Sequence, residues 1–211
     1  MKKTVLLLSA LLTAFAVVSC GTAGKTDDAA TQNNEIVQVT EAYEGSSEET
    51  AAEVTEAAKE FSIENLSTFE ITSSDLGEDG KWKDDIGSLK KKGNNVSPQL
   101  SWGSVEGAGE YVIYMIDTSA DNWMHWKSVS KETDFPTGWA PAEEYKGPYP
   151  PAGTGDHNYE VYVFALKEPA ETVEGRFDTT NEDFFEVIKS LDNGGGNVIS
   201  YGHIAGTYAF N

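Results

Sequence analysis

Two long apolar runs stand out in a chain that is otherwise rich in polar residues. The run from Tyr111 to Asp117 is apolar at every position before its terminal carboxylate, and the run from Tyr159 to Leu166 is interrupted only by Glu160. Short apolar runs rich in β-branched and aromatic residues are typical of strands that are buried on both faces. The pattern therefore predicts two central strands of a β-sandwich.

The last part of the chain predicts one more strand and one helix. The segment HIAGTYAF has alternating large residues that would share one face of a strand: Ile204, Tyr208 and Phe210. In NEDFFEVIKSL the apolar residues recur at helical spacing, with Thr180 as the expected N-cap, Asp183 at N3 and Gly194 just past the end. Several short strands with one or two short peripheral helices predict a mainly β fold, a β-sandwich with Greek-key connections.

The first twenty residues have a different pattern. Lys2 and Lys3 precede an apolar run from Val5 to Val18, which is short for a membrane span and typical of a secretory signal. The run ends in Val-Val-Ser-Cys, which resembles the lipobox of bacterial lipoproteins. Cys20 is the only cysteine of the chain, so an intramolecular disulfide is impossible. We expect Cys20 to be lipidated and the protein to be an exported, membrane-anchored lipoprotein of a bacterial cell envelope.

Composition divides the rest of the chain into two parts. Residues 21–60 contain ten acids and two lysines but few large apolar residues, which predicts an acidic disordered tether. Residues 61–211 contain the predicted strands and form the expected folded domain. The net charge of −20 argues against nucleic acid as a partner. Arg176 is the only arginine, so an arginine clamp for phosphate is not expected and binding of an anion should be weak.

Three segments hold most of the rare residues. They are NNVSPQLSW (94–102), DTSADNWMHW (117–126) and YKGPYPPAGTGDHNY (145–159). In the last segment, prolines fix φ and glycines allow positive φ, so the loop should have one stiff shape that delivers a histidine into a strand. Such stiffness suggests a loop that is shaped to bind a ligand.

Together with the closing GHIAGTY, these segments resemble the phosphatidylethanolamine-binding protein (PEBP) family in its bacterial, YbhB/YbcL-like branch. That family has an SPxLxW segment, a DPDAP-type turn followed by W-x-H-W, and a GPxPPxGxxHRY loop. The resemblance covers roughly residues 69–211. Two departures stand out: the turn reads Asp-Thr-Ser-Ala-Asp here, and asparagine replaces arginine after the loop histidine.

The resemblance implies a small ligand pocket at one end of the central sheet. Its ligand-binding residues would be Asp117, His125 and His157, with walls formed by Trp123, Pro150, Pro151, Gly153, Gly155 and Tyr159. Imidazoles can donate hydrogen bonds to a phosphate or carboxylate, and amides of a glycine turn can form an anion nest. The implied function is a non-catalytic binding or regulatory module for a small anion or a phospholipid head group, with no cofactor and with a protein partner at the pocket rim as a further option.

Two other classes remain open on sequence alone. One is a hydrolase, in which His125 or His157 would act as base on Ser97 or on water and Asp117 would orient the imidazole. The other is a metal site formed by the same carboxylate and two imidazoles, although no spacing requires a metal. Inhibition of a protease or kinase through the pocket rim is a variant of the binding hypothesis.

Overall fold

A computed structural model describes residues 60–90 and 92–209. The expected signal peptide, the lipidation site at Cys20 and most of the expected tether lie outside these residues, so they stay predictions. Within the described residues, no helix has the length and hydropathy needed to cross a membrane.

The larger of two sheets has five strands in the order β1-β8-β7-β4-β5. Its long members are β4 (Glu110–Asp117), β5 (Trp123–Ser130), β7 (Asp156–Leu166) and β8 (Val198–Ala209), which pair antiparallel. The short strand β1 (Ser67–Phe69) runs parallel to β8 at one edge. The two apolar runs of the sequence are thus β7 and β4, and both are central, as predicted.

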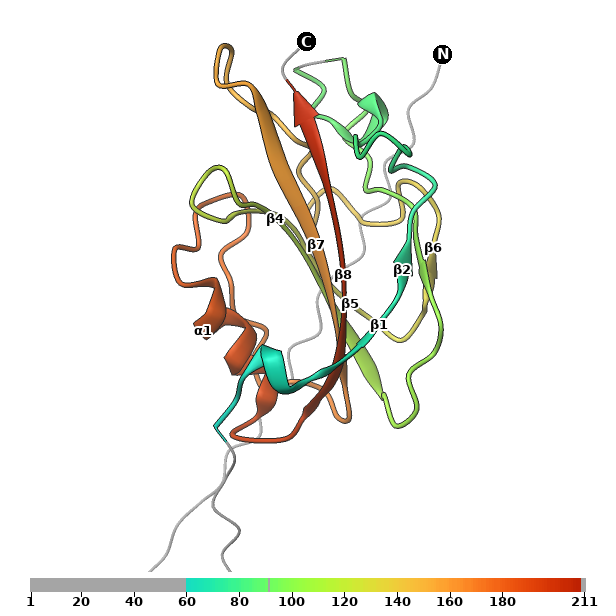
Figure 1. Cartoon of the computed structure of the whole chain (residues 1–211), viewed down its shortest axis with the longest axis vertical. Coiled ribbons are helices and arrows are strands. Elements are labelled where there is room, and N and C mark those ends of the chain that lie inside the picture. The colour runs from blue at the N-terminus through green and yellow to red at the C-terminus, as the bar shows by residue number, and fades with distance from the viewer. Residues whose placement is uncertain (1–59, 91, 210–211) are drawn as a thin grey trace, which may run out of the picture. The chain divides into compact units, whose positions relative to one another are not determined.

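A smaller sheet has three strands, β2 (Ile71–Thr72), β3 (Leu100–Trp102) and β6 (Asp134–Phe135), in the order β2-β3-β6. It lies on one side of the large sheet, and the helix α1 (Phe184–Lys189) lies on the other (Figure 1). Three short 3-10 helices complete the described elements: η1 (Ile63–Asn65), η2 (Asp84–Ile86) and η3 (Ser190–Asp192). The predicted β-sandwich is confirmed, while its Greek-key connections remain a prediction.

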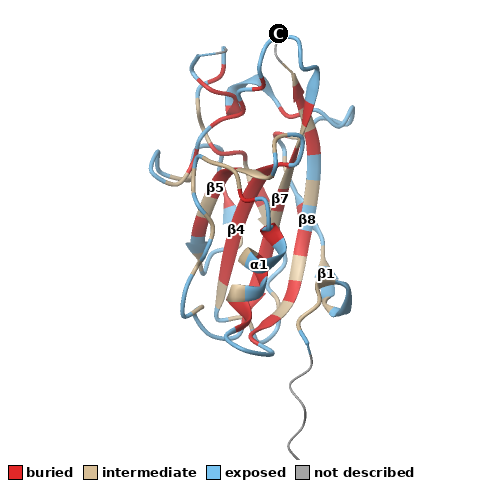
Figure 2. Cartoon of the chain, turned by 90° about the vertical axis from the view of Figure 1, so that its left-hand side faces the viewer, coloured by how far each residue is buried: buried red, intermediate tan, exposed pale blue. Residues whose placement is uncertain are grey.

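Strand β4 explains why the large sheet has two cores. Alternate residues of a strand point to opposite faces. Tyr111, Ile113 and Met115 pack toward the small sheet, whereas Val112 and Tyr114 pack toward α1. Both sets are buried, and Figure 2 shows β4 buried along its length behind α1. A strand that is covered on both sides must be apolar throughout, which is the pattern seen in the sequence.

The helix begins later than the sequence suggested. Thr180 was the expected N-cap and Asp183 the expected N3 residue, but the helix starts at Phe184 and Asp183 is its N-cap. The Asp183 carboxylate accepts a hydrogen bond from the backbone N–H of Glu186, 3.2 Å away. Before it, Asn181 bonds the backbone of residues 176 and 179, which holds that segment outside a helix. Gly194 does follow the helical region, after Asn193 in the left-handed conformation.

Candidate functional site

A cavity of about 460 Å³ opens where β4, β5 and β7 meet two loops. Its walls come from segments far apart in the sequence, and they contain the three polar residues expected at a pocket. The lining residues are Ser88, Lys90, Asp117, Ala120, Trp123, His125, Lys146, Gly147, Tyr149, Pro151, His157, Tyr159 and Asp178.

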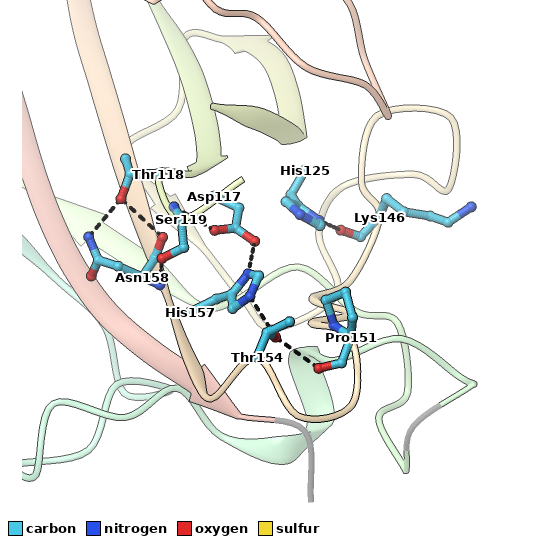
Figure 3. Close-up of polar contacts among 9 residues, drawn as sticks. All are labelled: Asp117, Thr118, Ser119, His125, Lys146, Pro151, Thr154, His157 and Asn158. Atoms are coloured by element: carbon cyan, nitrogen blue, oxygen red, sulfur yellow. Dashed lines mark hydrogen bonds and ion pairs between the residues drawn. The ribbon is translucent and has the colours of Figure 1, made fainter. Parts of the chain in front are cut away.

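Asp117 and His157 form the buried polar centre of this cavity. Asp117 on β4 pairs with Tyr159 on β7. His157 lies two residues before Tyr159 on the same strand, so its side chain points to the same face of the sheet as Asp117. Nδ1 of His157 lies 2.7 Å from Oδ2 of Asp117 (Figure 3). The other carboxylate oxygen accepts from the backbone N–H of Ser119 at 2.9 Å. Both oxygens of Asp117 are therefore engaged.

The second nitrogen of His157 is also occupied. Nε2 lies 2.9 Å from Oγ1 of Thr154, and the same hydroxyl lies 2.8 Å from the carbonyl oxygen of Pro151 (Figure 3). Thr154 stands between Gly153 and Gly155, whose φ angles of 85° and 84° are readily adopted only by glycine. The glycines thus shape the loop that carries the Thr154 hydroxyl to the imidazole.

His125 reaches the cavity because of a β-bulge. Met124 packs on the helix side of the sheet and Trp126 on the opposite side, although residues two apart normally share a face. The pairing explains this: Met115 faces Trp126 and the next residue, Ile116, faces Met124, so His125 has no partner on β4. Bulges of this kind redirect one side chain near functional sites.

The chain after Pro141 fixes the His125 ring. The backbone N–H of Lys146 donates to the carbonyl of His125, and Nδ1 of His125 lies 2.7 Å from the carbonyl of Lys146. A carbonyl can only accept, so Nδ1 carries the proton. Burial lowers the pKa of His125, which favours the neutral ring. Nε2 then presents a lone pair, and it has no partner among the described residues. This differs from the expectation that both imidazoles donate to an anion.

The close approach of two loops holds this wall in place. A side chain at Gly147 would begin 2.4 Å from the carbonyl oxygen of Ile86, so only glycine fits there. The N–H of Gly147 donates to the side chain of Asn95, and the N–H of Ser88 donates to the carbonyl of Pro148. These contacts bring residues 86–88 beside residues 147 and 148.

Charges at the cavity are paired with one exception. His157 lies against Asp117, and Nζ of Lys146 lies 3.3 Å from Oδ2 of Asp178. Lys90 has no ion pair among the described residues, and its Nζ lies 5.8 Å from the centre of the Tyr149 ring. Lys90 is therefore the lysine of the lining that has no counter-ion among the described residues.

Tyr159 closes the bottom of the cavity. Its ring is fully buried and packs edge-on against His125, with the ring centres 5.2 Å apart. Burial first, and then the Asp117 charge, raises the pKa of its hydroxyl. The hydroxyl lies near the Asp117 carboxylate, but none of its contacts with the described residues meets hydrogen-bond geometry. Its raised pKa keeps it protonated, so it can act as a donor.

The structure brings six of the nine expected pocket residues to the cavity and leaves three outside its lining. Those at the cavity are Asp117, Trp123, His125, Pro151, His157 and Tyr159. Pro150 is buried in the loop, while Gly153 and Gly155 are exposed and shape it. No sequence motif indicated Lys90, Lys146 or Thr154 as residues of the site. Lys90 sits in a lysine run beside Ser88, but no periodicity of the sequence places that run near the cavity.

The described residues lack the arrangements that the hydrolase and metal-site alternatives require. Ser97, the suggested nucleophile, is fully buried away from the cavity lining, and its Oγ accepts from the N–H of Ala140 at 3.0 Å. In the described part of the chain, no group of three or more His, Cys, Asp or Glu side chains is arranged to hold a metal ion.

Comparison with known proteins identifies the family. The model of the phosphatidylethanolamine-binding protein family matches residues 72–209, which include both sheets except for β1 and part of β2, and all three polar residues of the cavity. The chain belongs to this family. The resemblance drawn from the sequence motifs is thereby confirmed.

Two relatives place the chain further within the PEBP family. "Putative lipoprotein LppC" of Mycobacterium tuberculosis is 32% identical over 36% of this chain, which spans only 45% of LppC. YbcL of Escherichia coli is 27% identical over 47% of this chain and 69% of YbcL. This likeness agrees with the bacterial YbcL-like branch.

Solved structures show the same fold. The crystal structure of E. coli YbcL, described as a new member of the mammalian PEBP family, has a TM-score of 0.52 at 21% identity and covers 69% of this chain and all of YbcL. A PEBP homologue from Chlamydia trachomatis, CT736, gives a TM-score of 0.50 at 21% identity, over 68% of this chain and 99% of CT736. At this identity the likeness concerns the fold alone.

Proposed function

We propose that this protein is a non-catalytic binding module whose cavity takes a small anion, the phosphate or carboxylate part of a head group. The observation that carries the proposal is Lys90, a lysine of the lining that has no ion pair among the described residues. The other lining lysine, Lys146, is paired with Asp178, so Lys90 is the cation that is available to an anionic ligand. Membership of a family described as phosphatidylethanolamine-binding supports a binding role.

The cavity offers an anion two kinds of contact. Lys90 supplies an exposed charge at the mouth, and the Tyr159 hydroxyl supplies a neutral donor in the lining. The neutral His125 ring offers a lone pair on Nε2, which suits a ligand that also carries a hydrogen, such as an ammonium or a hydroxyl group. A head group with an anionic and a hydrogen-bearing part would match all three.

A hydrolytic role fits the same contacts poorly. General-base catalysis requires an imidazole nitrogen that is free to take a proton from the nucleophile. Both nitrogens of His157 are occupied, and the Thr154 hydroxyl that contacts it also lies against the Pro151 carbonyl. His125 has a free lone pair, but among the described residues no hydroxyl lies within hydrogen-bond distance of it.

Calorimetric titration of the full-length chain tests this function. Inorganic phosphate, acetate and phosphoethanolamine serve as separate ligands, so that a free anion is distinguished from a head group. Lys90→Ala should weaken phosphate binding about tenfold, because a charge-assisted contact is lost. Lys131→Ala removes an exposed lysine that does not line the cavity and should bind as the wild type does. Equal phosphate affinity in the wild type, Lys90→Ala and Lys131→Ala would show that the cavity is not the phosphate-binding site.

We also propose that the protein is held at a membrane through Cys20. The sequence pattern before Cys20 and the name of the M. tuberculosis relative support this assignment. Two acyl chains give stable anchoring where one gives only marginal binding. Cells that express the wild type should incorporate a fatty-acid probe into this protein, and the Cys20→Ala variant should not; labelling of the variant at the wild-type level contradicts the assignment.

A further inference from the structure

Three hydrogen bonds run in series beside the cavity. They join the Pro151 carbonyl to the Thr154 hydroxyl at 2.8 Å, the hydroxyl to Nε2 of His157 at 2.9 Å, and Nδ1 of His157 to the Asp117 carboxylate at 2.7 Å (Figure 3). Thr154 does not line the cavity, but Pro151, His157 and Asp117 do. The series therefore ties the exposed loop to the cavity wall.

A count of protons decides when all three bonds exist together. The Pro151 carbonyl can only accept, and a threonine hydroxyl has one proton. If that proton goes to Pro151, the hydroxyl oxygen must accept a proton from Nε2. Nδ1 needs a second proton for its bond to Asp117. Three bonds thus need three protons, of which the imidazole–carboxylate pair must hold two.

Those two protons belong on His157. Imidazole is ordinarily a much stronger base than an aspartate carboxylate. The carboxylate of Asp117 already accepts from the Ser119 N–H through one oxygen, so its other oxygen is the acceptor for Nδ1. The complete series is therefore an imidazolium between a carboxylate and a hydroxyl. A neutral His157 has one proton fewer, so the Thr154 hydroxyl must then lose its hydrogen bond either to the Pro151 carbonyl or to His157.

We propose that Thr154 is a positioning residue that clasps the 151–155 loop to His157 only when that imidazole is doubly protonated. Pro151 and Thr154 together stabilise the imidazolium, and loss of one proton from His157 releases one end of the clasp. Acidification then tightens the loop that borders the cavity, and a rise in pH loosens it. The clasp itself needs no ligand; only its effect on anion binding rests on the proposed function.

The groups around His157 are compatible with this charge. The titratable and charged residues of the elements packed near it are Asp117 on β4, His125 on β5, Tyr159 on β7, Tyr208 on β8, Lys90 and Tyr149 at the cavity mouth, and the Lys146–Asp178 and Lys81–Asp156 ion pairs. Asp117 is the one that contacts the imidazole directly. His125 is kept neutral by burial, so it adds no repelling charge.

Nuclear magnetic resonance of the full-length chain labelled with ¹⁵N-histidine tests the clasp. Two-bond proton–nitrogen correlations distinguish singly from doubly protonated imidazoles, and they are recorded between about pH 5 and 8, where imidazole titrates. Thr154→Val keeps the side-chain shape without the hydroxyl, and Thr154→Ser keeps the hydroxyl. At the pH where half of His157 is doubly protonated in the wild type, Thr154→Val should lower the ratio of doubly to singly protonated rings about threefold, the value of one modest hydrogen bond.

The conservative variant and a second histidine make the result specific. Thr154→Ser should restore the wild-type ratio, and the His125 signals should stay unchanged in both variants. An unchanged His157 ratio in Thr154→Val, or the same loss in Thr154→Ser, would overturn the proposal. Since Thr154 is exposed on a loop, neither variant threatens the fold.

A binding measurement separates this proposal from the proposed function. Acetate is titrated into the wild type and Thr154→Val at pH 6 and pH 8, because acetate keeps its charge over this range. The acetate affinity at pH 6 divided by the acetate affinity at pH 8 should be smaller for Thr154→Val than for the wild type. If neither acetate, phosphate nor phosphoethanolamine binds the wild type, the proposed function fails while the imidazole signals still decide the clasp.

Discussion

The two histidines of the cavity have opposite surroundings. His125 sits in a bulge of β5 and directs Nδ1 to a backbone carbonyl, whereas His157 begins the buried part of β7 and lies between a carboxylate and a hydroxyl. A neutral carbonyl does little to offset the cost of burying a charge, so His125 is neutral. His157 has a carboxylate at one ring nitrogen and a hydroxyl at the other. One residue type therefore presents a free lone pair at one wall and a ring with both nitrogens engaged at the other.

The largest expected effect comes from breaking the contacts of His157. Asp117→Asn removes a buried carboxylate that contacts Nδ1 of His157 and accepts from the N–H of Ser119, and it should lower the free energy of unfolding by about 3 kcal/mol. Urea unfolding at neutral pH measures the change. Asp178→Asn removes the partner of Lys146 at a partly exposed pair and should cost no more than about 1 kcal/mol. Equal losses in the two variants would show that the His157–Asp117 pair is no more important than a surface pair.

The neutral state of His125 is tested by the pH dependence of the free energy of unfolding. Burial lowers the pKa of His125, so the unfolded chain binds that proton more tightly than the folded chain does. The resulting stability is present above about pH 6.5, the unfolded value, and is lost as the pH falls below it, at up to about 1.4 kcal/mol per pH unit.

Replacing the ring should remove that dependence. His125→Gln is expected to have a shallower loss of unfolding free energy between about pH 6.5 and pH 5 than the wild type, as measured by urea unfolding at several pH values. His203→Gln retains His125 and should keep the wild-type slope. A slope that is identical in wild type and His125→Gln would mean that His125 is charged in the folded protein.

The smallest effect on stability is expected in the loop that carries Thr154. The double variant Pro150→Ala, Pro151→Ala should cost up to about 1 kcal/mol per proline, chiefly by adding freedom to the unfolded chain. Its phosphate affinity should fall further than stability does, because the path to His157 is no longer preset. Pro169→Ala, in a loop remote from the cavity lining, should leave affinity unchanged. A lower stability with unchanged phosphate affinity would show that the loop has only a structural role.

The sequence predicted the parts of the fold that depend on local pattern. The strands β4 and β7 were found because burial on both faces requires continuous apolar runs, and Asp117 and His157 mark their ends. The helix start was missed because Thr180 and Asp183 are both good caps on local grounds. The choice depended on Asn181, whose side chain bonds the backbone around it.

The site was only partly predictable for a similar reason. Motif positions led to Asp117, His125 and His157, but they carried no information on what each imidazole would contact. The neutral state of His125 follows from a bulge and from the return of the chain at Lys146. Lys90 joins the lining because two loops meet at Gly147. Such contacts arise in three dimensions and leave no periodic signal.

The bulge at His125 also affects how this sheet meets other protein molecules. Strand β5 is an edge strand, and an exposed regular edge is a template on which another chain can add a strand. The bulge interrupts its regular hydrogen-bonding row, and residues 144–146 cover the part of the edge at His125, Trp126 and Lys127. The bulge that directs His125 into the cavity thus also blunts, together with residues 144–146, an edge that could otherwise promote aggregation.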